Sequence, residues 1–224
     1  MRRHIFVGDV HGCANELQTL LRACEFTSTD QLMLVGDLLA KGPESGEVIR
    51  IARQTKALAV RGNHDERVIH WRAQHLRGEN PPAMKPHHQL AYSQLGDDDW
   101  RYLLAQPDYR RVPELNLIMV HAGLVPGVAL EQQRRDLLFN LRSVKANGEG
   151  SKRSEDGEPW ASQWRGPERV VFGHDAVRGL QKWPHATGLD TGCCYGGQLT
   201  ALVLPDDLLI SVPAEKAYVA VDRD

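Results

Sequence analysis

The sequence predicts an α/β protein in which two mixed β-sheets form a sandwich flanked by helices. In roughly the first 70 residues, short apolar runs each end in a polar, glycine-containing turn, and helical spacing follows each turn. Two later apolar runs each end at a histidine, and the C-terminal part has β-strand character on both sides of one turn. Repeated βα units followed by a β-rich tail favour two layers of sheet with helices outside them.

Each of the first three strands is predicted to lead into a helix. The apolar runs cover residues 4–7, 32–35 and 57–60, and each ends in a polar turn. After each turn, apolar residues recur three and four positions apart, which is the spacing of one helix face. Pro43 precedes the second helix, where a first helical turn tolerates proline. Three such units imply a largely parallel sheet with helices on its faces.

Further strands are predicted in the second half of the chain. The apolar runs 117–120 and 169–172 each lead towards a histidine. The tail has β character at 199–204 and 208–221, around a turn near 205–207. We expect this tail to form a second, antiparallel sheet.

We predict a single domain over residues 1–224, because this length fits one large domain. The polar stretch around 74–111 contains prolines and an acidic cluster, and it is predicted as an insertion of helices and loops that caps the sheet edge. The stretch around 146–163 is rich in glycine, serine and charge without any period, so a mobile loop is expected there.

The composition excludes several classes of protein. The 27 Lys and Arg against 29 Asp and Glu leave a net charge of −2, so stable binding to nucleic acid is not expected. No run approaches the ~18 apolar residues of a membrane helix. Few apolar residues precede Gly8, too few for a signal peptide. We therefore expect a cytoplasmic protein whose 4 cysteines are free thiols.

Ligand-forming side chains stand at the carboxyl ends of the predicted strands, the edge where open α/β sheets bind ligands. Carboxylate and imidazole groups without thiolates suit borderline divalent metals, and this set exceeds what one ion needs. The sequence therefore predicts two divalent ions, with Mn²⁺ as the first candidate and Fe, Zn, Ni or Co as alternatives. The predicted metal ligands are Asp9, His11, Asp37, Asn63, His121 and His174. The other histidines, among them His88, are predicted to be surface or packing residues.

These residues lie in motifs that resemble those of the calcineurin-like metallophosphoesterases. The motifs are Gly8-Asp9-Val10-His11-Gly12, Gly36-Asp37, Gly62-Asn63-His64-Asp65, the strand that ends at His121, and Gly173-His174. They occur in the family's order between residues 8 and 174. The resemblance implies the β-sandwich fold of that family and a metal-dependent hydrolase of phosphoric esters or anhydrides.

The resemblance also implies roles for individual residues. One metal ion would be held by Asp9, His11 and His174, the other by Asn63 and His121, with Asp37 as the bridge. His64 would protonate the leaving oxygen, which suits an imidazole beside a metal ligand. Lys41 and Arg142 would bind the substrate phosphate, Lys41 at a position where the family more often has an arginine. Arg61 and Arg178 are alternatives for the phosphate-binding arginine.

One position separates branches of this family. Protein Ser/Thr phosphatases typically carry an Asp-Arg pair where this chain has Ala40-Lys41. That motif and the segment 189–200 are similar instead to the symmetrical diadenosine tetraphosphatases, and Lys41 resembles their ApaH-like relatives. Without a carboxylate at position 40, His64 is expected to be a less firmly oriented acid. That loss matters least for a weakly basic nucleotide leaving group.

The expected activity is that of a dinuclear metal-dependent phosphohydrolase that cleaves phosphoanhydride bonds of nucleotides. Dinucleoside polyphosphates are the first candidate substrates, capped RNA and polyphosphate are further ones, and phosphomonoesterase activity should accompany them. The resemblance implies in-line attack by a metal-bridging hydroxide. A protein Ser/Thr phosphatase is the alternative. The expected partner is a phosphorylated small molecule or nucleotide, with no membrane, and the sequence leaves the oligomeric state open.

Overall fold

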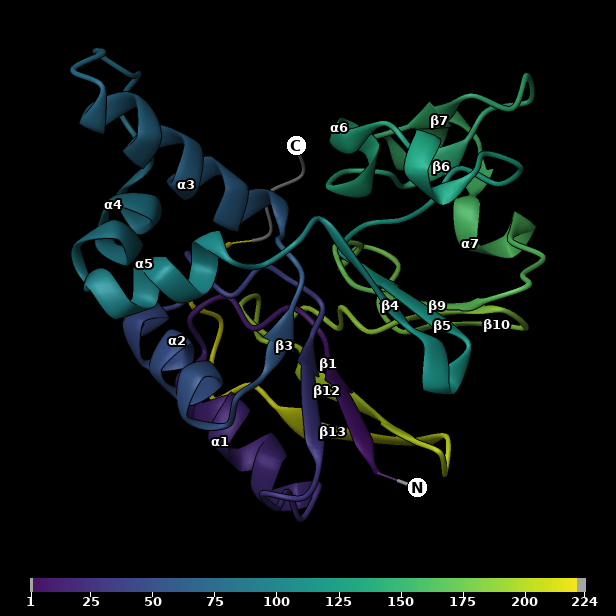
Figure 1. Ribbon diagram of the computed structural model, residues 1–224, viewed down its shortest axis with the longest axis horizontal. Helices are drawn as coiled ribbons and strands as arrows, with labels where there is room; N and C mark the ends of the chain where they lie inside the picture. The colour runs from purple at the N-terminus through teal and green to yellow at the C-terminus, as the bar shows by residue number, and fades with distance from the viewer. Residues whose placement is uncertain (1, 221–224) are drawn as a thin grey trace.

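The computed structural model describes residues 2–220, and two five-stranded sheets form its centre (Figure 1). The first sheet has the order β13-β12-β1-β2-β3, in which β1, β2 and β3 are parallel and β12 is antiparallel to both of its neighbours. Its strands are β1 (His4–Val7), β2 (Gln31–Leu34), β3 (Leu58–Ala59), β12 (Gln198–Leu204) and β13 (Leu208–Pro213).

The second sheet has the order β10-β11-β9-β5-β4, with a parallel centre and antiparallel edges. Its strands are β4 (Tyr109–Val112), β5 (Leu117–Val120), β9 (Arg169–Phe172), β10 (Gln181–Trp183) and β11 (Ala186–Gly188). Both sheets are mixed and helices lie outside them, so the predicted sandwich is confirmed.

Alternating side chains of one strand fill two different cores. On β1, Phe6 belongs to the cluster between the sheets, whereas Ile5 and Val7 belong to the cluster beneath the helices. Met33 of β2 and Met119 of β5 meet Phe6 between the sheets. Successive strand residues face opposite sides, so a strand without polar positions is one that is covered on both faces. Burying one such side chain contributes about 1.5–3 kcal/mol.

Helices cover the first sheet on its outer side (Figure 1). The three predicted βα units are confirmed, with α1 (Ala14–Ala23), α2 (Ser45–Gln54) and α3 (Asn63–Leu76) after β1, β2 and β3. Two further helices follow, α4 (Pro86–Ser93) and α5 (Asp97–Leu104). None of the helices in residues 2–220 is long and apolar enough to cross a membrane.

The segment around 74–111 contributes to both the helical layer and the second sheet. Trp100 and Leu103 of α5 join the same hydrophobic cluster as α1 and α2. The end of this segment enters edge strand β4, which the sequence did not predict. Only Val112 of β4 is buried, so its sequence lacks the apolar run by which the other strands were predicted.

The segment around 146–163, where a mobile loop is predicted, contains short regular elements. It contributes to a three-stranded sheet and ends in a short helix. At the start of that helix, buried Trp160 donates to the Ala122 carbonyl at 3.0 Å, and its ring centroid lies 4.7 Å from that of Phe172. The remaining short elements in the second half of the chain are α6 (Arg135–Leu138), β6 (Ser143–Val144), β7 (Gly150–Ser151), β8 (Glu158–Pro159) and α7 (Trp160–Gln163), with 3-10 helices at Pro113–Leu115, Leu130–Gln132 and Ser154–Asp156.

The C-terminal hairpin belongs to the first sheet, so the prediction that it forms a second one is wrong. Strand β12 pairs with β1 from His4↔Leu204 to Val7↔Ala201. Every residue of β12 after Gln198 is buried, which requires cover on both faces and therefore an internal position in a sheet. The second strand ends at Pro213, short of the predicted end at 221, a residue outside those described.

Candidate active site

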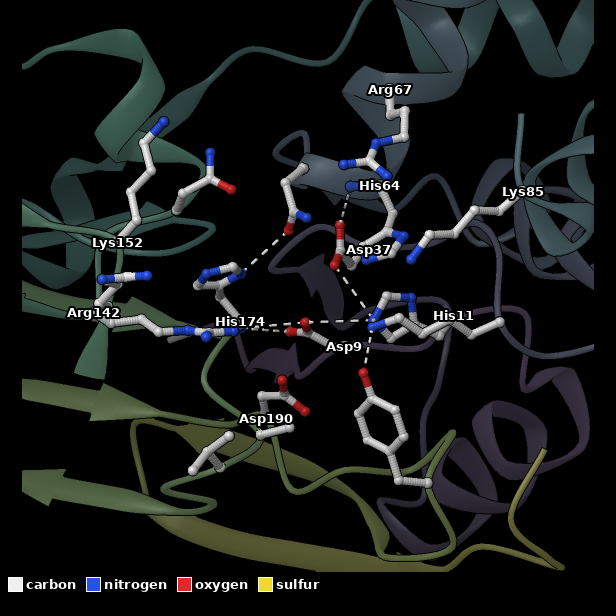
Figure 2. Close-up of a pocket in the computed structure, with 17 residues that line it drawn as sticks. Asp9, His11, Asp37, His64, Arg67, Lys85, Arg142, Lys152, His174 and Asp190 are labelled. Carbon is white, nitrogen blue, oxygen red and sulfur yellow. Dashed lines mark hydrogen bonds and ion pairs between the residues drawn. The ribbon is translucent and has the colours of Figure 1, made fainter. Parts of the chain in front are cut away.

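The polar side chains at the strand ends converge on one cavity of about 310 Å³ (Figure 2). It is lined by five of the predicted ligands, namely Asp9, His11, Asp37, Asn63 and His174. The sixth, His121, is fully buried behind them, with its Nε2 atom 3.0 Å from Asn63 Oδ1. The structure therefore brings together all of the predicted metal ligands, from segments as far apart as residues 9 and 174.

Asp37 lies at the centre of this group. One of its oxygens, Oδ2, is 3.3 Å from His11 Nε2 and 3.5 Å from His121 Nε2. Its other oxygen accepts the backbone N–H of His64 at 2.9 Å. Imidazole nitrogens from two distant segments thus lie close to one oxygen of Asp37, as expected for a ligand shared by two metal ions.

The resemblance assigns His174 to the same ion as Asp9 and His11, but its ring lies beside Asn63 and His121. Its Nδ1 atom is 3.2 Å from Asn63 Oδ1, and its ring centroid is 5.2 Å from that of His121. Its backbone N–H instead donates to both oxygens of Asp9, at 3.1 and 3.2 Å. His174 therefore donates its backbone N–H to Asp9 and places its side chain beside Asn63. The first group consists of Asp9, His11 and Asp37. The second group consists of Asp37, Asn63, His121 and His174.

Two of the histidines have their tautomer set by the backbone. His11 Nδ1 donates to the Leu39 carbonyl at 3.1 Å, and His121 Nδ1 donates to the Val35 carbonyl at 3.0 Å. A carbonyl oxygen only accepts, so the proton resides on Nδ1 and each Nε2 keeps a lone pair. Both Nε2 atoms face Asp37. This hydrogen bond is typical of metal-binding histidines, so the donor set fits divalent ions.

The glycines of two motifs make room for the carboxylates. A Cβ atom at Gly62 would collide with the Asp37 carboxylate, and one at Gly173 would collide with that of Asp9. The N–H of Gly62 also donates to Asp65, which in turn accepts the backbone N–H groups that follow Asp37. Gly62 and Gly173 are therefore required, because each lies too close to a carboxylate of the site for any side chain to fit.

The carboxylates and imidazoles of the centre have shifted pKa values. Burial raises the pKa of Asp37 to about 6, and burial together with Asp190 and Asp37 raises the pKa of Asp9. Burial lowers the pKa of His121 to about 4 and lowers that of His174 well below its ordinary value. Burial makes the ionised carboxylates unfavourable and keeps the imidazoles neutral. A bound cation would stabilise the ionised carboxylates and bind the lone pairs of the neutral imidazoles.

We expect divalent metal to raise the melting temperature more at pH 7 than at pH 4.5. The pKa of Asp37 is above its value in the unfolded chain, so its contribution to stability is present at low pH and is lost as the pH rises from about 4 to about 6. A bound cation replaces the lost proton and restores that contribution. Thermal unfolding of metal-stripped protein, with and without Mn²⁺ at each pH, measures the increase in melting temperature. An equal increase at both pH values would contradict the prediction.

His64 is held by another histidine rather than by a carboxylate. Its Nδ1 atom lies 3.0 Å from Nε2 of His88, and the two rings stack at 14° with centroids 5.1 Å apart. His88 is completely buried, so the prediction that it is a surface or packing residue missed this contact. The hydrogen bond directs the other nitrogen of His64 away from His88. The hydrogen-bond partner of His64 is therefore His88, in a chain that has no carboxylate at position 40. No motif in the sequence indicates this role of His88.

Replacing His88 by leucine is expected to lower kcat for a phosphoserine peptide by about 10-fold to 100-fold, the usual effect of losing such a support. His88→Gln should retain most of the activity, because its amide reaches the place of Nε2 and can hydrogen-bond to His64. Steady-state kinetics and the melting temperatures of both variants measure this. Equal loss of kcat in the two variants would rule out orientation through the hydrogen bond.

Cations surround the carboxylates (Figure 2). Lys41 Nζ lies 3.0 Å from His11 Nε2 and donates to the Tyr195 hydroxyl at 2.7 Å. Arg142 lines the cavity, and its buried Nε atom has no hydrogen-bond partner among the described residues. Both predicted phosphate-binding residues therefore lie at the cavity. Four cations that the sequence did not predict also line it, namely Arg67, Lys85, Lys152 and Arg153.

The two alternative arginines have other roles. Arg61 donates to the Leu104 carbonyl at 2.7 Å, outside the cavity lining. Arg178 pairs with Asp175 and donates to the Ser154 carbonyl at 3.1 Å. These contacts occupy both guanidinium groups, and neither arginine lines the cavity.

A carboxylate shared by two groups of oxygen and nitrogen atoms, in a cavity lined by cations, is typical of metal-dependent hydrolases of phosphate compounds. The chain belongs to the calcineurin-like phosphoesterases, whose family model matches residues 3–208. It is similar to named tetraphosphatases within that family, as the ApaH-like motifs predict. The symmetrical bis(5'-nucleosyl)-tetraphosphatase of Shewanella frigidimarina is 30% identical over 93% of this chain and 97% of its own length.

Two further relatives cover nearly the whole chain. The asymmetrical bis(5'-nucleosyl)-tetraphosphatase PrpE of Anoxybacillus flavithermus is 26% identical over 96% of this chain and 95% of its own. A crystal structure provisionally assigned as a diadenosine tetraphosphatase superposes with a TM-score of 0.84 at 41% identity, over 95% of this chain and 94% of the other. The relatives thus include enzymes named for symmetrical and for asymmetrical cleavage.

Proposed function

We propose that this enzyme uses two divalent metal ions to hydrolyse phosphoanhydride bonds of nucleotides, with dinucleoside polyphosphates as its principal substrates. One observation carries the proposal, the clustering of the predicted ligands around Asp37 at a cavity lined by cations. Mn²⁺ is the expected metal, with Fe, Zn, Ni and Co as alternatives. Four free, buried cysteines support a reducing, cytoplasmic location.

One ion would be held by Asp9, His11 and Asp37, and the other by Asp37, Asn63, His121 and His174, whose close contacts support this division. When bound, the two ions would polarise the phosphoryl oxygens and lower the pKa of the attacking water. Residues of the chain perform the other tasks. Lys41 and Arg142 bind the non-bridging oxygens, and His64 donates a proton to the leaving oxygen. The backbone N–H of His64 also orients Asp37.

The surroundings of the cavity favour a chain of phosphates over a single phosphate on a protein side chain. Cations line it on two sides, with Arg67 and Lys85 across from Arg142 and Lys152 (Figure 2). A monoester brings one phosphate, whereas a tetraphosphate bridge brings several charged groups to such a lining. Capped RNA and polyphosphate contain the same kind of bond and are expected as further substrates. Phosphomonoesters should be cleaved more slowly.

Product analysis tests this function. Metal-stripped protein resupplied with Mn²⁺ is given diadenosine tetraphosphate or a phosphoserine peptide, and nucleotides and free phosphate are resolved. Fast formation of ADP with slow release of phosphate from the peptide is expected, and ADP as sole nucleotide product identifies symmetrical cleavage. AMP and ATP would identify asymmetrical cleavage. Preference for the peptide would make the enzyme a protein Ser/Thr phosphatase.

Substituting Arg142 is expected to weaken substrate binding more than turnover. Arg142→Ala should raise KM for diadenosine tetraphosphate by about 10-fold or more, because a charge-assisted bond to phosphate contributes about 1.5–3 kcal/mol. Arg142→Lys should recover part of that loss, since lysine keeps the charge without the planar fork. Arg165→Ala, which removes an arginine outside the cavity lining, is the control. Unchanged KM in Arg142→Ala would remove Arg142 from the phosphate site.

A further inference from the structure

A second cavity of about 490 Å³ adjoins the candidate metal centre and shares Asn63, Arg67 and Asn140 with it. Its first wall is one face of α3, where lining residues between Asn63 and His70 recur at helical spacing. Its second wall is α6 with the two residues that follow it, which face α3 in Figure 1. We call this cavity, between residues 63–70 and 135–140, the α3–α6 groove.

We propose that the α3–α6 groove binds the nucleoside of the substrate, with the guanidinium of Arg135 as the surface on which the base stacks. This assignment rests on the proposed function, since it places the nucleoside of a nucleotide whose phosphates lie in the first cavity. The volume of the groove is within the range of small-molecule sites. Because the two cavities share residues, one substrate molecule can occupy both.

Arg135 is fixed in place and electrically neutralised. Its Nε and Nη2 atoms donate to the two oxygens of Asp108 at 2.7 and 3.1 Å, and its Nη1 donates to Glu66 at 2.8 Å. Two carboxylates on one guanidinium leave little net attraction for a phosphate. One side of the guanidinium lies over the Phe139 ring, 4.9 Å from its centroid, and the side chain is still 52% exposed. A planar, held and half-exposed guanidinium is suited to stacking on an aromatic base.

The other polar groups of the groove complement this surface. The amide of Asn140 donates to the Asp136 carbonyl at 2.9 Å, and its Oδ1 atom accepts no hydrogen bond from any described residue. That oxygen is therefore left to accept an N–H of a base. Arg67 makes no ion pair within residues 2–220 and lines both cavities, where the phosphate chain would join the nucleoside. His70 is exposed on the α3 wall and can cover the other side of the base.

The test compares substrates with and without a nucleoside. Kinetics of the Mn²⁺-loaded enzyme are measured on diadenosine tetraphosphate and on inorganic tripolyphosphate. The variants are Arg135→Lys, which keeps a charge for Asp108 and Glu66 but removes the planar surface, and His70→Ala. His75→Ala is the matched control, an exposed histidine on the same helix outside the groove. We expect Arg135→Lys to raise KM for the dinucleotide by about 10-fold and to leave tripolyphosphate kinetics unchanged.

Binding measurements separate failure of this assignment from failure of the proposed function. Calorimetric titration of the metal-loaded protein with ADP and with pyrophosphate needs no turnover. Weaker ADP binding by Arg135→Lys with unchanged pyrophosphate binding supports the groove even if the enzyme prefers phosphomonoesters. Equal losses for both ligands, or no loss for either, would overturn it, whatever the outcome with the two substrates.

Discussion

Asp37→Asn is expected to lower kcat on diadenosine tetraphosphate by about 10³-fold or more. Asp37 Oδ2 faces His11 and His121, one from each ligand group, so its charge would serve both proposed metal positions. An amide has the same shape but no charge to share between two cations. The contribution of such ions to the transition state is several kcal/mol, which corresponds to the stated loss.

The same substitution should stabilise the metal-free fold. Burial raises the pKa of Asp37 to about 6, so a neutral amide removes the cost of a buried carboxylate at pH 7. We therefore expect Asp37→Asn to melt at a higher temperature than metal-stripped wild type at pH 7 and to bind less than two metal ions per chain. Asp30→Asn, at a buried carboxylate paired with Arg3 outside the cavity, is the control. Two bound ions with near-full turnover would disprove the bridging role.

The strand ends and their ligands could be predicted because both depend on local sequence. An apolar run that stops at Gly-Asn or Gly-His marks the edge of the sheet, and the glycine is needed there because Gly62 and Gly173 lie against carboxylates. The glycine of each motif thus reflects a close contact between segments that are far apart in the sequence. This is why residues as far apart as Asp9 and His174 could be assigned to one site.

Contacts that depend on the direction of a side chain could not be predicted. His174 follows its strand as expected, yet its ring points to Asn63 while its backbone N–H serves Asp9. His88 reaches His64 from α4, a helix without a motif, and its burial depends on how that helix packs beside α3. The sequence predicts which edge a residue occupies but not the rotamer or the helix packing that completes the site.

His64→Asn is expected to separate the two substrate classes. For a phosphoserine peptide, kcat should fall by about 10²–10⁴-fold, because the serine alkoxide must be protonated as it leaves. For diadenosine tetraphosphate the loss should be about 10-fold or less, since a nucleotide leaving group is weakly basic and the metal ions share its charge. The variant removes only the imidazole, because the hydrogen bond from position 64 to Asp37 comes from the backbone N–H.

Parallel kcat measurements on the two substrates decide whether His64 acts as an acid. The hydrogen bond to His88 directs the free nitrogen of His64 away from that histidine, and His64 itself lines the cavity. His185→Asn, at a histidine beyond the cavity lining, controls for loss of an imidazole elsewhere. A difference of about 10-fold or more between the substrates supports proton donation to the leaving oxygen. Equal losses would show that the imidazole serves the phosphoryl group or the metal ligands, because only protonation of the leaving group depends on its basicity.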